Sequence, residues 1–419
     1  MQSKLHTSVV SGISNLDTAA WDALVPRDEP QLRSELLRAV EKSGQGAGAH
    51  YIAVREGGPG GRMLAVAVTH AVDVDLLTLA SPKLHKVAAK IRRGPFKRLL
   101  ILRSVTSGPF ITNCRPNLYA DPNLPYPLLR EAASALIQAL DAIPGAGLRL
   151  LFELPESMVS IFGPALEEQG YFQARSLPGT HLDIRWDDFD AYIADMRKFY
   201  RRAIRHDQAA AVELEFELLE DFSHLADEVH RLYMNVLERA QTTFGCLTRD
   251  FFEEFGRCSQ SRVVTARERS TGRLVGIEVL LLGDHLIQDL YTGVDYEFNE
   301  RYHTYFNLIY PGIALACNRV ARLSTGQTSY AFKSRLGVQP FPLYLYAKHR
   351  FSPLHAVLRR FKDLLCPQVE TFTHRVFHDQ AGTTAAPREP IAVAAVPAPM
   401  LPLLGPPAVT VSPVDLATV

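Results

Sequence analysis

The stretch that decides the fold is Leu323-Ser-Thr-Gly-Gln-Thr-Ser-Tyr-Ala-Phe-Lys-Ser-Arg-Leu-Gly337, followed by Pro340-Phe-Pro-Leu-Tyr-Leu-Tyr346. Its first residues predict a strand that ends in a polar turn at Gly326 and Gln327. The residues from Phe332 onward predict a short amphipathic helix that stops at Gly337. The segment rich in tyrosine and leucine predicts another strand. Strand, short helix, glycine and strand in this order are typical of the end of an α/β unit.

The same order of elements occurs twice along the chain, which predicts an internal repeat. Each copy has a hairpin of two apolar strands around a glycine-containing turn, followed by helix, strand, helix and strand. The first copy comprises the hairpin of residues 50–55 and 62–69, helix 127–143, strand 148–153, a helix ending near 172 and strand 181–186. The second comprises the hairpin of residues 262–267 and 273–282, helix 306–318, strand 321–324, helix 332–337 and strand 343–347.

The expected fold is therefore mixed α/β, with two tandem units at residues 1–186 and 187–376. Residues 377–419 are expected to form a disordered tail rich in proline and alanine. Eight of the forty residues from 380 to 419 are proline and three are charged, so this segment is not expected to bury a core.

Composition narrows the class of protein. The chain has 419 residues, of which 47% are apolar, and Lys plus Arg equals Asp plus Glu at 45 each. The zero net charge gives no bulk attraction to DNA or to an anionic membrane. The five cysteines form no CxxC pair, and neither an apolar N-terminal signal nor a run of about 18 apolar residues is present. These features predict a cytoplasmic protein with reduced thiols and no membrane span.

The motifs resemble those of FemABX-like acyltransferases, a branch of the GNAT superfamily that includes peptidoglycan-biosynthesis and BioF2-like acetyltransferases. The matching residues are the basic helix from Arg197, Tyr291-Thr-Gly-Val-Asp295, Gly326-Gln327 and Phe332-Lys333. The resemblance implies two tandem GNAT-like domains, the second of which carries the chemistry. It implies an N-acyltransferase that moves an acyl or aminoacyl group from acyl-CoA or aminoacyl-tRNA to a small-molecule or peptide amine. No permanently bound cofactor is expected.

Four residues are candidates for catalysis, which needs a general base, an oxyanion donor and an acid for the leaving group. Glu278 interrupts an otherwise apolar strand, where an isolated carboxylate is costly unless it faces a pocket or a cation. Asp289 is the competing base, on the strand that corresponds to the superfamily's acyl-donor strand. Lys333 is part of the family pattern and would steady an oxyanion, and Tyr330 would protonate the leaving group. The structural alternatives are an ion-paired Glu278 and a solvated surface lysine.

A second group of residues is expected to bind the donor. Arg197, Arg201 and Arg205 repeat every four residues and would form one stripe for phosphate, or simply a solvated helix face. Gln327 and Arg335, on either side of Lys333, complete the set. The segment 295–302 lacks the Gly-rich pyrophosphate loop of ordinary acetyl-CoA-binding GNATs, which favours the Fem-like branch and aminoacyl-tRNA.

No metal is expected, because no HxxxH motif or Cys/His cluster occurs and His206 and His303 stand alone in the sequence. The alternative function is a catalytically silent GNAT-fold recognition or scaffold protein. The position of Glu278 relative to Lys333 distinguishes an enzyme from a scaffold protein, because catalysis requires the two side chains to lie in one site. A nucleic-acid binder that uses the basic stretches is a third reading, against which the zero net charge argues.

Overall fold

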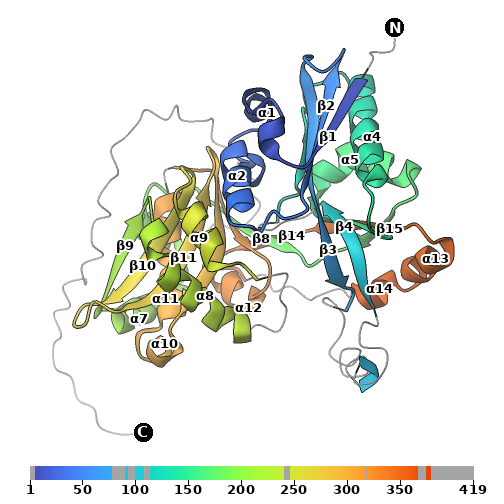
Figure 1. Cartoon of the computed structure of the whole chain (residues 1–419). Helices are drawn as coiled ribbons and strands as arrows, with labels where there is room; N and C mark the ends of the chain where they lie inside the picture. Colours follow the sequence, from blue (N-terminus) through green and yellow to red (C-terminus); the bar gives the residue numbers. More distant parts are fainter. Residues whose placement is uncertain are drawn as a thin grey trace, which may run out of the picture.

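The computed structural model describes residues 5–77, 90–92, 100–107, 111, 114–239, 246–317, 319–366 and 374–378. Two mixed β-sheets lie side by side, each with helices packed against it (Figure 1). The expected mixed α/β fold is thus confirmed. The expected tail from residue 379 onward lies outside the described residues.

The first sheet has the strand order β1-β2-β3-β4-β6-β15-β7, with β5 paired to β3. Its neighbours are antiparallel except for β4 and β6, which run parallel. The strands are β1 (Leu5–Val10), β2 (His50–Glu56), β3 (Met63–Asp75), β4 (Ile101–Ser107), β5 (Leu118–Ala120), β6 (Leu148–Pro155), β7 (Phe172–Arg175) and β15 (Leu343–His349).

The second sheet has the order β14-β8-β13-β12-β11-β10-β9, and here β12 and β13 form the parallel pair. It repeats the plan of the first sheet: four antiparallel strands, one parallel step, then two antiparallel strands. Its strands are β8 (Gly179–Asp183), β9 (Leu214–Leu219), β10 (Ser261–Glu268), β11 (Leu274–Leu282), β12 (Leu286–Val294), β13 (Arg322–Gly326) and β14 (Gln339–Phe341).

The two halves exchange their closing strands, which the sequence did not predict. Strand β8 comes from the first half but lies between β14 and β13 in the second sheet. Strand β15 comes from the end of the second half but lies between β6 and β7 in the first sheet. A boundary at residue 186 therefore does not separate the sheets. The reason is that an alternating apolar pattern defines a strand without specifying its partner.

Helices cover both faces of each sheet, which explains why strands β2 and β11 are apolar almost without interruption. In the first sheet, α4 packs on Ile52 and Val54, and α1 on Tyr51 and Ala53. In the second sheet, α8 and α11 pack on opposite faces of β11. The helices are α1 (Thr18–Leu24), α2 (Ser34–Lys42), α4 (Tyr126–Ala142), α5 (Glu156–Glu168), α6 (Phe189–Asp195), α7 (Lys198–Ala210), α8 (Ala226–Arg239), α9 (Arg249–Gly256), α10 (Tyr296–Tyr302), α11 (Thr304–Ala316), α12 (Tyr330–Lys333), α13 (Ser352–Arg360) and α14 (Lys362–Leu365).

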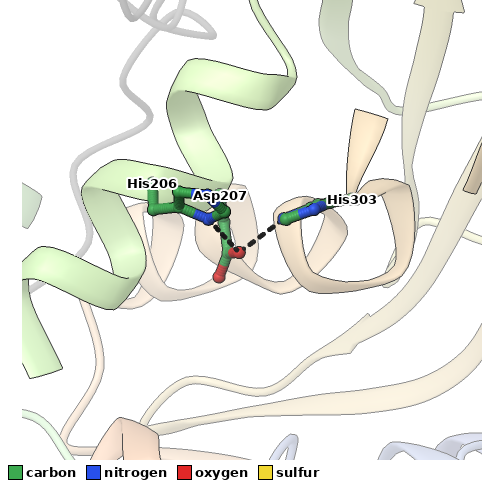
Figure 2. Close-up of side chains that lie close together, drawn as sticks. All are labelled: His206, Asp207 and His303. Atoms are coloured by element: carbon green, nitrogen blue, oxygen red, sulfur yellow. Dashed lines mark hydrogen bonds and ion pairs between the residues drawn. The ribbon is translucent and has the colours of Figure 1, made fainter. Parts of the chain in front are cut away.

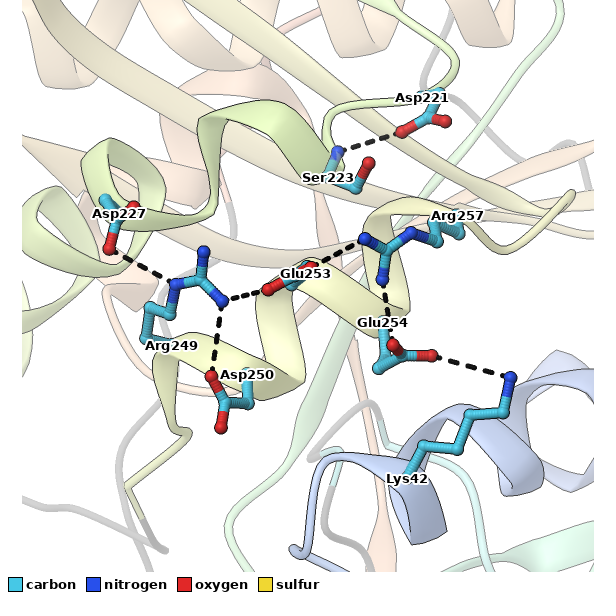
Figure 3. Close-up of polar contacts among 9 residues, drawn as sticks. All are labelled: Lys42, Asp221, Ser223, Asp227, Arg249, Asp250, Glu253, Glu254 and Arg257. Carbon is cyan, nitrogen blue, oxygen red and sulfur yellow. Dashed lines mark hydrogen bonds and ion pairs between the residues drawn. The ribbon is translucent and has the colours of Figure 1, made fainter.

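The halves also meet where α2 packs against α9. Leu36 and Val40 of α2 belong to the same buried cluster as the phenylalanines of α9. At the rim, Lys42 Nζ lies 3.8 Å from a carboxylate oxygen of Glu254, at the edge of a network centred on Arg249 and Arg257 (Figure 3). Such exposed ion pairs contribute little, so the apolar contact holds this interface.

The last described segment, residues 374–378, packs on the second half. Phe377, which the sequence analysis placed in the tail, is only 3% exposed and pairs with Met196 as an isolated bridge. Its ring lies 4.6 Å from that of Trp186. The core therefore continues through Phe377. Among the described residues, no helix is both long enough and apolar enough to cross a bilayer.

Candidate active site

Glu278 lies in the middle of β11 and is 2% exposed. Gly276, two residues earlier on the same face of the strand, lets α11 approach closely, because a Cβ there would lie 2.7 Å from the Thr304 side chain. Glu278 therefore points toward the first turn of α11 and away from α8. Its charge is felt there by Tyr305.

Glu278 forms a pair with Asp289 of the neighbouring strand β12. Burial raises the pKa of Glu278 well above its ordinary value, and the charge of Asp289 and a side-chain hydrogen bond with it raise the pKa further. A hydrogen bond with Thr292 and the charge of Lys333 act in the opposite direction. Glu278 therefore keeps its proton to a higher pH than an ordinary glutamate does, and the protonated carboxyl donates a hydrogen bond to Asp289, which is partly exposed.

The hydrogen-bonded pairing of β12 with β13 ends beside this pair. Strands β12 and β13 are paired from Leu286 to Gln288 on β12, ending opposite Ser324 on β13. Asp289 is the first residue of β12 beyond the paired region, while β12 itself continues to Val294. The acid pair therefore lies where the ladder between these two parallel strands ends.

Lys333 ends α12 and is buried. Its Nζ donates hydrogen bonds to the carbonyl oxygens of Thr325 and of Gln327, the latter at 2.8 Å. Burial lowers the pKa of Lys333, and the charges of Asp289, Cys114 and Glu278 oppose that shift. Two of the three N–H donors are thus used to hold the ammonium, and among the described residues the third meets no further acceptor.

The first half contributes Cys114 to this neighbourhood, a residue that the sequence analysis did not select. Burial raises the pKa of its thiol, with the charge of Glu153 as the next cause and that of Lys333 opposing it. The backbone N–H of Cys114 donates to Glu153 Oε2 at 3.0 Å. A lone cysteine in a sequence gives no signal of such a position, so the structure was needed to find it.

Strained backbone is concentrated here. Six described non-glycine residues have positive φ, and four of them are Cys114 (62°), Glu153 (58°), Thr328 (62°) and Ser329 (51°). The last two precede α12, and the Ser329 carbonyl accepts the Lys333 N–H at 3.1 Å. Such strain costs energy and persists where the surrounding structure fixes it, often at functional sites.

The remaining candidates near Lys333 have structural partners. The Tyr330 hydroxyl donates to the Pro178 carbonyl at 2.8 Å, and burial raises its pKa to about 12. The Gln327 side chain donates to the Leu177 carbonyl, also at 2.8 Å. Both residues therefore fix α12 to the segment that leads into β8. Arg335 is exposed.

The expected basic stripe lies on α7. Arg197 is the N-terminal cap of the helix, Arg201 donates to the Ala194 carbonyl at 3.2 Å, and Arg205 is exposed. Helix α7 packs on α10 and α11 through Ile204 and its neighbours. None of the contacts found among the described residues joins the stripe to the group around Lys333.

Two further residues near the acid pair were missed. Thr292 of β12 lies directly opposite Glu278 of β11. Tyr305 lies in the first turn of α11, and its hydroxyl is 3.3 Å from Ser329 Oγ. Thr292 belongs to the motif Tyr291-Thr-Gly293, so its strand position was available from the pattern. Tyr305 carried no such signal.

The expectation that His206 and His303 stand alone is wrong in space. Their rings lie 5.1 Å apart, on either side of Asp207 (Figure 2). The two histidines are far apart in the sequence, and only the packing of α7 against the start of α11 brings them together.

Two sheets of one plan, joined in tandem and exchanging a strand, define a tandem GNAT-like fold, as expected. The chain belongs to the FemAB-like family, described as peptidoglycan biosynthesis/recognition, whose model matches residues 134–373, more than half of the chain. No curated protein matches the chain.

Solved structures with a similar fold include FemX, at 12% identity and a TM-score of 0.54 over 84% of this chain and 100% of FemX. A second is the C-terminal domain of a putative lysylphosphatidylglycerol synthetase from Agrobacterium fabrum. It is 12% identical, with a TM-score of 0.47 over 85% of this chain and 99% of that domain. A third is a tandem GNAT protein from the clavulanic acid biosynthesis pathway. It is 14% identical, with a TM-score of 0.41 over 83% of this chain and 99% of that protein.

Proposed function

We propose that the protein is an N-acyltransferase that passes an aminoacyl or acyl group from a carrier to the amine of a peptide or small molecule. The observation that carries this proposal is the convergence of Glu278, Asp289 and Lys333, which come from three separate segments. A scaffold protein has no need to bury an acid pair beside a lysine. The family description makes a peptide of a peptidoglycan precursor the favoured acceptor.

The acid pair supplies the base. During attack, the amine nitrogen forms a bond to the carbonyl carbon of the donor and loses a proton. Asp289 is the member of the pair that is partly exposed, so it is the one that accepts this proton. Glu278, which is buried and has a raised pKa, holds Asp289 by a hydrogen bond. This division of roles differs from the sequence-based preference for Glu278 as the base.

Lys333 supplies charge for the oxyanion. As the carbonyl carbon becomes tetrahedral, its oxygen gains negative charge, which the remaining N–H of the ammonium can bind. The carbonyls of Thr325 and Gln327 fix the ammonium before the reaction begins. The C–S or C–O bond to the carrier then breaks, and the leaving group takes a proton. Tyr330 is proposed as its source, after release from the Pro178 carbonyl.

The turn before α10 favours aminoacyl-tRNA over acyl-CoA as the donor. Ordinary GNATs hold pyrophosphate with backbone N–H groups at a helix N-terminus. In this chain, the Asp295 carboxylate caps α10 and accepts the Glu297 N–H at 3.2 Å. Asp295 is also paired with Arg273 at 2.7 Å. A pyrophosphate at this turn would meet a carboxylate, whereas the stripe of Arg197, Arg201 and Arg205 remains for a tRNA backbone.

The test is to incubate the protein with charged tRNAs or acyl-CoAs and peptide amines, and to detect products by mass spectrometry. Transfer should occur with at least one aminoacyl-tRNA and should fall sharply in Lys333→Met. Arg269→Met, which removes an exposed cation from the turn between β10 and β11, is the control and should keep its activity.

The alternative, a silent recognition protein, predicts binding of the peptide without any product. If no donor of either class yields product while the peptide binds equally well to wild type and Lys333→Met, the enzyme proposal is wrong.

A further inference from the structure

A second group of polar side chains lies where α7 meets the junction of α10 and α11. His206 and Asp207 project from the C-terminal part of α7, and His303 connects α10 to α11 (Figure 2). Asp207 Oδ1 lies 2.8 Å from His303 Nδ1 and 3.8 Å from His206 Nδ1. One ligand atom from each of the three residues lies within 4.8 Å of the others.

These atoms have the chemistry and spacing of a zinc site. Zinc binds imidazole nitrogen and carboxylate oxygen at about 2.0–2.2 Å, which places the ligand atoms of a tetrahedral site about 3.3 Å apart. The two measured separations, 2.8 Å and 3.8 Å, fall on either side of that value. All three ligand atoms already lie within 4.8 Å of one another.

The two less exposed ligands are held by outer contacts of the kind found around metal sites. Asp207 Oδ2 accepts a hydrogen bond from the Tyr310 hydroxyl at 2.9 Å, and the Asp207 carbonyl accepts one from the Asn307 side chain at 2.7 Å. His303 is fixed in a left-handed conformation, with φ of 48° and ψ of 39°. The carboxylate and one imidazole are therefore positioned in advance.

The position of His206 distinguishes a metal site from a hydrogen bond that only links two helices. The Asp207–His303 hydrogen bond would link α7 to α11 without any ion, and it does not require His206. The His206 side chain is 75% exposed, yet its ring is next to that of His303. We propose that His206, Asp207 and His303 bind a divalent zinc-type cation, with a remaining position open to water.

The experiment uses full-length protein without an affinity tag, titrated with Zn²⁺ by calorimetry and with Co²⁺ by visible absorption. One equivalent should bind, and the Co²⁺ spectrum should show nitrogen and oxygen ligands without thiolate bands. His206→Asn should weaken binding by more than about tenfold, since the loss of even an outer contact costs 10–100-fold. Bound Zn²⁺ should also raise the Tm of the wild type.

Three variants serve as controls. His303→Asn removes the ligand but suits the left-handed backbone, because Asn tolerates that conformation better than most residues, and it should abolish binding. His285→Asn removes an exposed histidine that, among the described residues, is paired with one carboxylate, Asp28 at 2.7 Å, and this variant should bind as the wild type does. Cys246→Ser removes the exposed thiol and should also have no effect. Wild-type affinity in His206→Asn, loss of binding in Cys246→Ser, or no binding to the wild type would each overturn the proposal.

Discussion

Glu278→Gln should flatten the dependence of stability on pH. In the folded protein, burial and Asp289 raise the pKa of Glu278 well above its ordinary value, whereas in the unfolded chain it returns to about 4.3. Between these two values the folded state binds one proton more than the unfolded state. Stability from this group is therefore complete below the ordinary pKa and is lost as the pH rises toward the folded-state pKa. Each pH unit in that window costs about 1.4 kcal/mol.

The assay is urea denaturation of wild type and Glu278→Gln at half-unit steps from about pH 5.5 to 7.5. Over that range the variant should gain stability relative to the wild type, by about 1.4 kcal/mol for each pH unit that lies below the folded-state pKa of Glu278. The amide of glutamine imitates the protonated acid, since it can still donate a hydrogen bond to Asp289. Glu215→Gln, on the exposed side of β9 in the same sheet, is the control and should follow the wild type.

Parallel stability curves for wild type and Glu278→Gln would refute the reasoning. They would mean that Glu278 loses its proton in the folded protein as readily as in the unfolded chain. The acid pair would then hold two charges, and Asp289 would have no protonated partner to position it.

Three further predictions concern transfer and binding. Asp289→Asn should lower turnover by about 10²–10⁴-fold with little change in donor binding, measured by single-turnover kinetics, and an unchanged rate would remove Asp289 as the base. Lys333→Met should lower turnover by about 10²–10³-fold, the cost of losing one oxyanion donor, while the exposed-cation control Arg269→Met keeps the wild-type rate. The double variant Arg201→Glu, Arg205→Glu should weaken tRNA binding, measured by a filter assay, by about 1.5–3 kcal/mol for each lost charge-assisted contact. If the variant and the wild type bind tRNA equally well at low salt, the arginine stripe is a solvated helix face.

The sequence predicted most elements because their local patterns are strong. The hairpin of β10 and β11, the helix α4 and the short helix at Lys333 all occur within a few residues of the expected positions. These elements depend on periodicity, turns and glycine, which act over short distances. The resemblance to the FemABX-like enzymes correctly gave the family.

What the sequence could not predict depends on contacts between distant segments. The partners of β8 and β15 are chosen by the sheets into which they fit, and the alternating pattern does not record that choice. The same holds for Cys114, which the first half brings toward Lys333. It also holds for His206 and His303, which meet only once α7 has packed on α11.

The exchange of strands has a mechanical consequence. The chain crosses between the sheets twice at one place, after β7 and before β15, and the Ser176 N–H donates to the Leu343 carbonyl at 2.9 Å where the crossings meet. Any rotation of one sheet against the other must bend these two adjacent crossings. Leu177 and Pro178 of the first crossing are the residues whose carbonyls hold Gln327 and Tyr330. The crossing at Leu177 and Pro178 therefore both joins the sheets and holds the segment that carries Lys333. A ligand that rotates one sheet against the other therefore also moves the ammonium of Lys333.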